Sequence, residues 1–75
     1  MTQPTINDLT IKRVDRMMED AVYLDGAYIG SLLYDWRTDN ITAWPAKGHR
    51  RTFHPKHKQQ AQQYLIKQHL KNKKD

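Results

Sequence analysis

Basic side chains are concentrated in the last third of this 75-residue chain, from Lys47 to Asp75. That segment holds nine of the thirteen Lys and Arg residues and a single acid, so its formal charge is +8. The residues before it hold four basic residues and seven acids, which gives −3. A chain polarised in this way is expected to turn its basic end toward a negatively charged partner.

The basic residues around the arginine pair Arg50-Arg51 have the chemistry of phosphate contacts. Lysine and arginine attract phosphate by charge, and each neutralised phosphate releases condensed counterions. Arginine adds a planar fork that grips phosphate or guanine with two hydrogen bonds. The competing interpretation, strongest for Lys71, Lys73 and Lys74, is a charged surface that keeps a small protein soluble. The predicted nucleic-acid-binding residues are Lys47, Arg50, Arg51, Lys56, Lys58 and Lys67.

A second candidate site consists of aromatic residues in the middle of the chain. Exposed aromatic side chains on a sheet can stack on unpaired bases. They can equally form a hot spot for a protein partner. A third interpretation is that the N-terminal segment covers them, since large exposed apolar patches are uncommon on monomers. The predicted stacking or partner-binding residues are Tyr23, Tyr28, Tyr34 and Trp36.

Catalytic and metal-binding patterns are weak. The single serine, Ser31, has no predicted base beside it, and the chain contains no cysteine. His54 and His57 could offer two nitrogens to a metal, but no third ligand lies nearby in the sequence. No pair of carboxylates lies near a predicted cleft. We therefore expect no enzyme activity, no catalytic residues, no cofactor and no metal site.

The aromatic residues belong to a predicted β-hairpin over residues 21–36. Asp25-Gly26 suits a two-residue type I′ turn, in which both central residues have positive φ. The turn places Tyr23 opposite Tyr28 and Val22 opposite Ile29. The aliphatic face of the hairpin is then Val22, Leu24, Ile29 and Leu33, and the aromatic face is Tyr23, Tyr28, Leu32, Tyr34 and Trp36. Gly30 lacks a side chain and indicates a bulge or a close approach.

Strands are also predicted on both sides of this hairpin. Residues 8–16 alternate like a strand that ends in a turn at residues 17–20, but their spacing also fits a short helix capped by Asn7. Residues 41–44 form the next strand after a turn at residues 37–40. If Trp36 faces Ile41, Trp44 lies beside Leu33 on the aliphatic face. Residues 50–53 are predicted to add a short fourth strand.

The C-terminal part of the chain predicts one amphipathic helix, from Lys56 to about Lys71. Pro55 fits its first turn, where the missing N–H is harmless. The side that packs on the aliphatic sheet face is formed by Ala61, Tyr64, Leu65 and Leu70. The lysines lie on the opposite side and point to solvent.

These elements predict an α+β fold, in which a small antiparallel meander of three to four strands is packed on one face by a single C-terminal helix. One domain spans residues 1–75, with 1–6 and 72–75 expected to be flexible. Apolar runs are too short for a membrane span, so we expect a cytoplasmic protein without membrane contact. A core this small also makes a homodimer plausible.

The leading hypothesis is a small, non-enzymatic, basic nucleic-acid-binding module that uses its C-terminal loop and helix, with DNA favoured over RNA. The layout resembles that of plant AP2-type and integrase arm-type DNA-binding domains, in which the sheet lies against DNA. The resemblance is one of architecture only, because no signature residue of either family is present. The alternative is an interaction or inhibitor protein of the phage or mobile-element type, which docks its basic end on an acidic protein surface.

Overall fold

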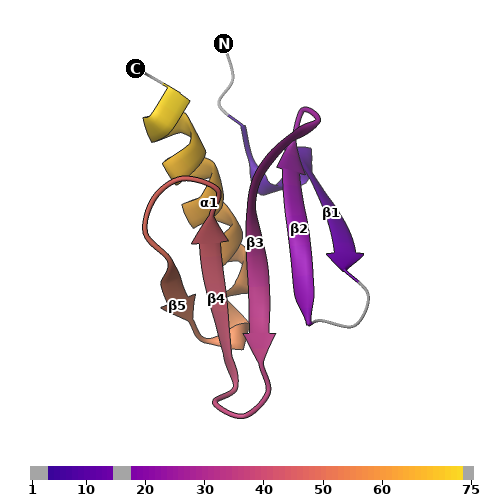
Figure 1. The fold of residues 1–75 in the computed structure, drawn as a ribbon, viewed down its shortest axis with the longest axis vertical. Coiled ribbons are helices and arrows are strands. Elements are labelled where there is room, and N and C mark those ends of the chain that lie inside the picture. The colour runs from indigo at the N-terminus through magenta and orange to yellow at the C-terminus, as the bar shows by residue number, and fades with distance from the viewer. Residues whose placement is uncertain (1–3, 15–17, 74–75) are drawn as a thin grey trace.

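The computed structural model describes residues 4–14 and 18–73, which form one antiparallel sheet with a helix on one face (Figure 1). The strands lie in the sheet in the order in which they occur in the sequence. The α+β meander backed by a C-terminal helix is confirmed, with five strands in place of three to four. The elements are η1 (Ile6–Asp8), β1 (Leu9–Val14), β2 (Glu19–Leu24), β3 (Ala27–Asp35), β4 (Asn40–Pro45), β5 (Arg51–Phe53), η2 (Pro55–His57) and α1 (Lys58–Lys73).

The N-terminal segment, for which both a strand and a helix were considered, is a strand preceded by a short 3-10 turn. β1 pairs with β2 from Leu9 opposite Leu24 onward. Thr5, not Asn7, caps η1: the Asn7 N–H donates to the Thr5 hydroxyl, and the Thr5 N–H donates to Asp8 Oδ2 at 2.8 Å. Residues 15–17, which include the start of the predicted turn, lie outside the described residues, and β2 already begins at Glu19.

The core lies between the sheet and α1. The helix packs on β3, β4, β5 and η1. Its buried residues Ala61, Leu65 and Ile66, with half-buried Tyr64 and Leu70, include the packing side that the sequence predicts. Ile6, from the N-terminal end that was expected to be flexible, is packed against this core. The buried apolar residues from the sheet are Val22, Leu24, Ile29, Leu32, Ile41 and Ala43.

A β-bulge in β3 changes which residues face the helix. Tyr23 pairs with Tyr28 as predicted, but Val22 pairs with Gly30, so Ile29 is an extra residue on β3. The Ile29 carbonyl accepts a hydrogen bond from the Ala46 N–H at 3.0 Å. The bulge that the sequence indicates at Gly30 is therefore present, with Ile29 as its extra residue.

Gly30 allows three chain segments to approach closely beside this bulge. Its φ is +156°, in a region that L side chains rarely adopt. A Cβ at this position would lie 2.7 Å from both Leu65 Cδ2 and the Trp44 carbonyl oxygen. Glycine is therefore required here by space as well as by backbone conformation.

The predicted faces are wrong beyond the bulge, because one extra residue reverses the alternation of side chains. Leu32 is buried on the helix side, whereas Leu33 lies on the other face. Trp44 pairs with Ser31 and shares the face of Leu33, so the two are close as predicted, but on the uncovered face.

The predicted register of the next hairpin is also wrong, by two residues on β3. Ile41 pairs with Tyr34 and not with Trp36, and Asp35 pairs with Asn40. Trp36 therefore belongs to the turn between β3 and β4. Tyr34 lies on the helix side of the sheet, where it lines a small hollow with Leu32 and Lys58.

Replacing Gly30 tests the close packing at the bulge. Gly30→Ala is expected to lower the free energy of unfolding by about 3 kcal/mol or more, since a strained backbone and an overpacked contact both contribute. The added Cβ would meet a backbone oxygen of β4, which cannot move alone. Urea unfolding followed by circular dichroism measures the change.

Gly26→Ala is the matched control for this prediction. Gly26 has a φ of +82°, but nothing lies within 4 Å of an added Cβ. Only the backbone cost of about 1–2 kcal/mol applies there. Equal decreases in the two variants would show that the approach of Leu65 and Trp44 to Gly30 does not matter.

Candidate functional site

The six predicted phosphate contacts do not form one patch. Four of them surround β5 and the start of α1: Arg50 directly before β5, Arg51 at its first position, Lys56 in η2 and Lys58 in the first turn of α1. Lys67 lies further along α1, roughly 14 Å from Lys58 for a rise of about 1.5 Å per residue. Lys47 follows β4 and lines a hollow with His69, toward the other end of the helix. All six residues are exposed.

The two arginines at β5 are each held over aromatic rings, on opposite faces of the sheet. The Arg50 guanidinium lies 5.2 Å from the centroid of the Trp44 ring, on the face turned away from α1. Arg51 lies 5.3 Å from the Phe53 ring and 5.9 Å from the Tyr64 ring, on the helix side. Such contacts fix the position of a guanidinium without neutralising its charge.

The loop before these arginines is fixed by a hydrogen bond to the helix. The Tyr64 hydroxyl donates to the His49 carbonyl oxygen at 2.6 Å. Tyr64 also packs on Phe53, with ring centroids 5.9 Å apart. The arginine pair is therefore attached to the helix on one side and to β4 on the other.

The sheet face turned away from α1 is called the open face, because no described helix or strand packs on it. Residues 4–8 lie against α1, so they do not cover the predicted aromatic residues. On the open face Tyr23 and Tyr28 make an edge contact with centroids 5.7 Å apart. Lys12 lies 5.4 Å from the centroid of the Tyr23 ring. The Tyr28 hydroxyl and the Ser31 Oγ are hydrogen-bonded at 2.6 Å.

A surface hollow on the open face, here called the tryptophan hollow, combines aromatic and basic residues. Its volume is about 730 Å³. Trp36 is 69% exposed and Trp44 is 47% exposed. The lining residues are Met18, Leu33, Tyr34, Asp35, Trp36, Arg37, Thr42, Trp44, Arg50 and Thr52.

A second hollow of about 350 Å³ adjoins the first on the open face. It contains Tyr28 and Ser31, and Leu33 and Trp44 line both hollows. Leu33 and Trp44 therefore form a shared wall. Together the two hollows bring Trp36, Trp44 and Tyr28 into one shallow surface.

Three of the four predicted stacking residues contribute to the open face. Tyr23 and Tyr28 lie on it, and Trp36 reaches it from the turn between β3 and β4. Tyr34 is the exception. It pairs with Ile41 and its side chain lies on the helix side of the sheet, so it only borders the tryptophan hollow.

Sequence reasoning missed Trp44 and Arg37, which line the tryptophan hollow. The feature of the sequence that could have placed Trp44 on the open face was Gly30, which indicates a bulge in the strand that pairs with it. A bulge placed before Leu32 moves Trp44 to the face of Tyr28, whereas a regular hairpin leaves it among the aliphatic residues. Arg37 carries no comparable signal, since it lies in a turn.

The two arginines that the structure describes outside the basic segment, Arg13 and Arg37, are paired with acids. The Arg13 Nε lies 2.6 Å from Asp20 Oδ1, and the Arg37 Nε lies 3.8 Å from Asp35 Oδ1. Neither Arg50 nor Arg51 has an ion pair of this kind within residues 4–14 and 18–73. The positive charge of the two arginines at β5 is therefore not compensated by the described part of the chain.

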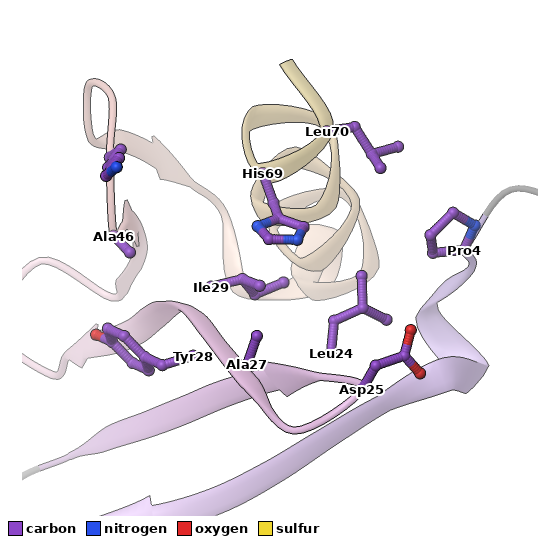
Figure 2. A pocket seen from close by; sticks show the side chains of 10 residues that line it. Pro4, Leu24, Asp25, Ala27, Tyr28, Ile29, Ala46, His69 and Leu70 are labelled. Atoms are coloured by element: carbon purple, nitrogen blue, oxygen red, sulfur yellow. The ribbon is translucent and has the colours of Figure 1, made fainter. Parts of the chain in front are cut away.

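A different hollow, of about 470 Å³, lies between the β2–β3 turn and the last turns of α1 (Figure 2). In this view the His69 ring points toward Ile29. Leu24 lies below the ring and to its right, and Pro4 lies at the right of the picture. The titratable residues in its walls are Asp25, Tyr28, Lys47 and His69. Of the predicted site residues, this hollow holds only Lys47 and Tyr28.

Histidines do not form a metal site in the part of the chain that the structure describes. No group of three or more His, Cys, Asp or Glu side chains there is placed to hold a metal ion. His54 and His57 lie with ring centroids 6.3 Å apart, and the His54 Nδ1 accepts a hydrogen bond from the Lys56 N–H. His54 thus acts as the cap of η2.

Among the described residues, no helix combines the length and the apolar content needed to cross a membrane. Comparisons of the chain with protein-family models, with curated proteins and with solved structures found no match. The residues of the chain and their geometry are therefore what indicates its function.

Tyr34 provides a test of the geometry at the rim of the tryptophan hollow. Its hydroxyl donates a hydrogen bond to Asp39 Oδ1 at 2.7 Å. This bond raises the pKa of Tyr34 above its ordinary value of 10.0, and desolvation and the charges of Asp39 and Asp35 act in the same direction. A raised pKa means that the folded state favours the neutral hydroxyl. The resulting stability is present below pH 10.0 and is lost as the pH rises through the folded pKa.

Asp39→Asn is expected to lower the pKa of Tyr34 toward 10.0, because it removes the negative charge that opposes ionisation. Asn tolerates the positive φ of 54° at this position, so the turn should be kept. Ultraviolet absorbance of tyrosinate during an alkaline titration measures the change. An identical titration curve in the variant would contradict the hydrogen bond.

Proposed function

We propose that the protein binds nucleic acid, and that the free edge of β5 and the start of α1 contact its phosphates. The observation that carries this proposal is one of charge: no Asp or Glu occurs from Asn40 to Lys74, a segment with nine Lys and Arg residues. The ion pairs of Arg13 and Arg37 involve acids outside this segment. A phosphate backbone that approaches β5 meets cations without a carboxylate from the same segment to repel it.

The position of β5 supports this assignment. Among the described strands β5 pairs only with β4, and so it forms one edge of the sheet. At that edge Arg50 lies on the open face and Arg51 lies on the helix side. Lys56 in η2 and Lys58 at the start of α1 follow β5 in the chain. A backbone that runs along the edge can contact both arginines, and phosphate contacts of this kind fix register rather than read sequence.

Aromatic support favours phosphate binding by these arginines. A guanidinium that stacks on a ring by its face keeps N–H donors at its edge for two hydrogen bonds to phosphate. Because Trp44, Phe53 and Tyr64 already restrict the two side chains, less conformational entropy is lost on binding.

Arg50→Ala is expected to weaken binding to any nucleic acid by about ten-fold or more, because each hydrogen bond to a charged group that is lost costs about that factor or more. It should also reduce the slope of log affinity against log salt by about 0.7–0.9 for each phosphate that is no longer neutralised. Arg51→Ala should have a similar effect, and the double variant a larger one. Fluorescence anisotropy with labelled oligonucleotides over a salt titration measures both quantities.

Arg13→Ala is the matched control, because it removes the same charge from an arginine that is paired with Asp20. Its affinity and salt slope should stay close to those of the original protein. If the Arg50 and Arg51 double variant binds as tightly as the original protein, the proposal is wrong. If no nucleic acid binds even at low salt, the alternative of an acidic protein partner is favoured instead.

A further inference from the structure

We propose that the nucleic acid is single-stranded and that its unpaired bases stack in the tryptophan hollow of the open face. This inference rests on the proposed function, since it names the form of nucleic acid that the protein binds. It goes beyond phosphate contact, because it assigns a second surface with a different chemistry.

Exposed aromatic rings lie on a surface that nothing in the described chain covers. Trp36 is 69% exposed, and Trp44 and Tyr28 are 47% and 48% exposed. Trp36 and Trp44 line one hollow, and Trp44 and Tyr28 line the next. The three rings are therefore presented along adjoining hollows. Successive bases of a single strand stack on aromatic rings arranged in this way, whatever their sequence.

Charges around this surface are complementary to a nucleic acid. Arg50 lies over Trp44 and Lys12 lies over Tyr23, so cations flank the aromatic surface on both sides. Two acids also face it: Asp35 in the tryptophan hollow and Glu19 in the adjoining one. Asp35 lies near Arg37, whereas Arg50 has no ion pair within the described residues. The phosphates are therefore expected on the Arg50 side, which is also the side of β5.

A duplex is excluded as the preferred ligand of this surface by the geometry of its bases. Bases in a duplex are already stacked on their neighbours, so their faces cannot reach Trp36 or Trp44 without unpairing. Unpaired bases expose their faces and can be turned toward a protein ring. At the same salt concentration a single strand gains stacking that a duplex of equal length lacks.

The two tryptophans are natural reporters of base stacking, since the chain contains no others. The full chain is titrated with oligo(dT), with a duplex of the same length and with inorganic polyphosphate, which carries charge but no bases. We expect oligo(dT) to bind most tightly and to quench tryptophan fluorescence. Polyphosphate should quench much less than oligo(dT), because it can alter the surroundings of Trp44 through Arg50 but carries no base to stack on Trp36.

Trp36→Ala should weaken oligo(dT) binding roughly 5- to 150-fold, with polyphosphate binding unchanged. Anisotropy of labelled oligo(dT) measures the affinity of the variant, because the substitution removes one of the reporters. Polyphosphate affinity is measured by isothermal titration calorimetry. Equal oligo(dT) affinity in the variant and the original protein would contradict stacking on Trp36.

Trp36→Phe is the matched variant, because it keeps an aromatic ring and should retain most of the affinity. Trp36 is largely exposed in a turn, so neither substitution should unfold the chain, and circular dichroism checks this. Tight duplex binding without quenching would overturn the single-strand inference while leaving the proposed function intact. Failure of all three ligands to bind would overturn both.

Discussion

The arrangement of this small domain depends on the close approach of three chain segments at Gly30. The missing side chain leaves room for Leu65 of α1 on one side and for the Trp44 carbonyl of β4 on the other. The bulge at this point inserts Ile29, which is buried, and reverses the alternation of the rest of β3. The helix contact and the composition of the open face therefore share one cause.

The meander topology converts a division of charge along the sequence into a division in space. The strands lie in the sheet in sequence order. The segment up to β3, which carries most of the acids, therefore lies toward the β1 edge, and the segment from β4 to α1, which carries most of the basic residues, lies toward the β5 edge. A fold with crossover connections would have placed acidic and basic strands next to each other. The field around β5 follows from the order of strands as much as from the number of lysines.

Local chemistry explains which features could be predicted from the sequence. The Asp25-Gly26 turn, the pairing of Tyr23 with Tyr28 and the helix that buries Leu65 each depend on residues close together in the chain. The faces beyond Gly30 could not be predicted in the same way, since one inserted residue reverses every later side chain. Trp44 was assigned to the aliphatic face for this reason. Arg50 and Arg51 lie on opposite faces because adjacent side chains alternate in an extended chain, whereas the rings that hold them come from β4 and α1 and were not predicted as their partners.

Trp44 connects the two surfaces of the proposed site. Its ring supports Arg50 next to the β5 edge and also forms the wall between the two hollows of the open face. A base that stacks near this ring would lie beside a guanidinium already positioned for the adjoining phosphate. Both interactions gain from rings and arginines that are ordered before the ligand arrives, because less entropy is then lost on binding. Phosphate contact and base stacking are thus expected to be coupled through Trp44, whereas Trp36, in its exposed turn, contributes to stacking alone.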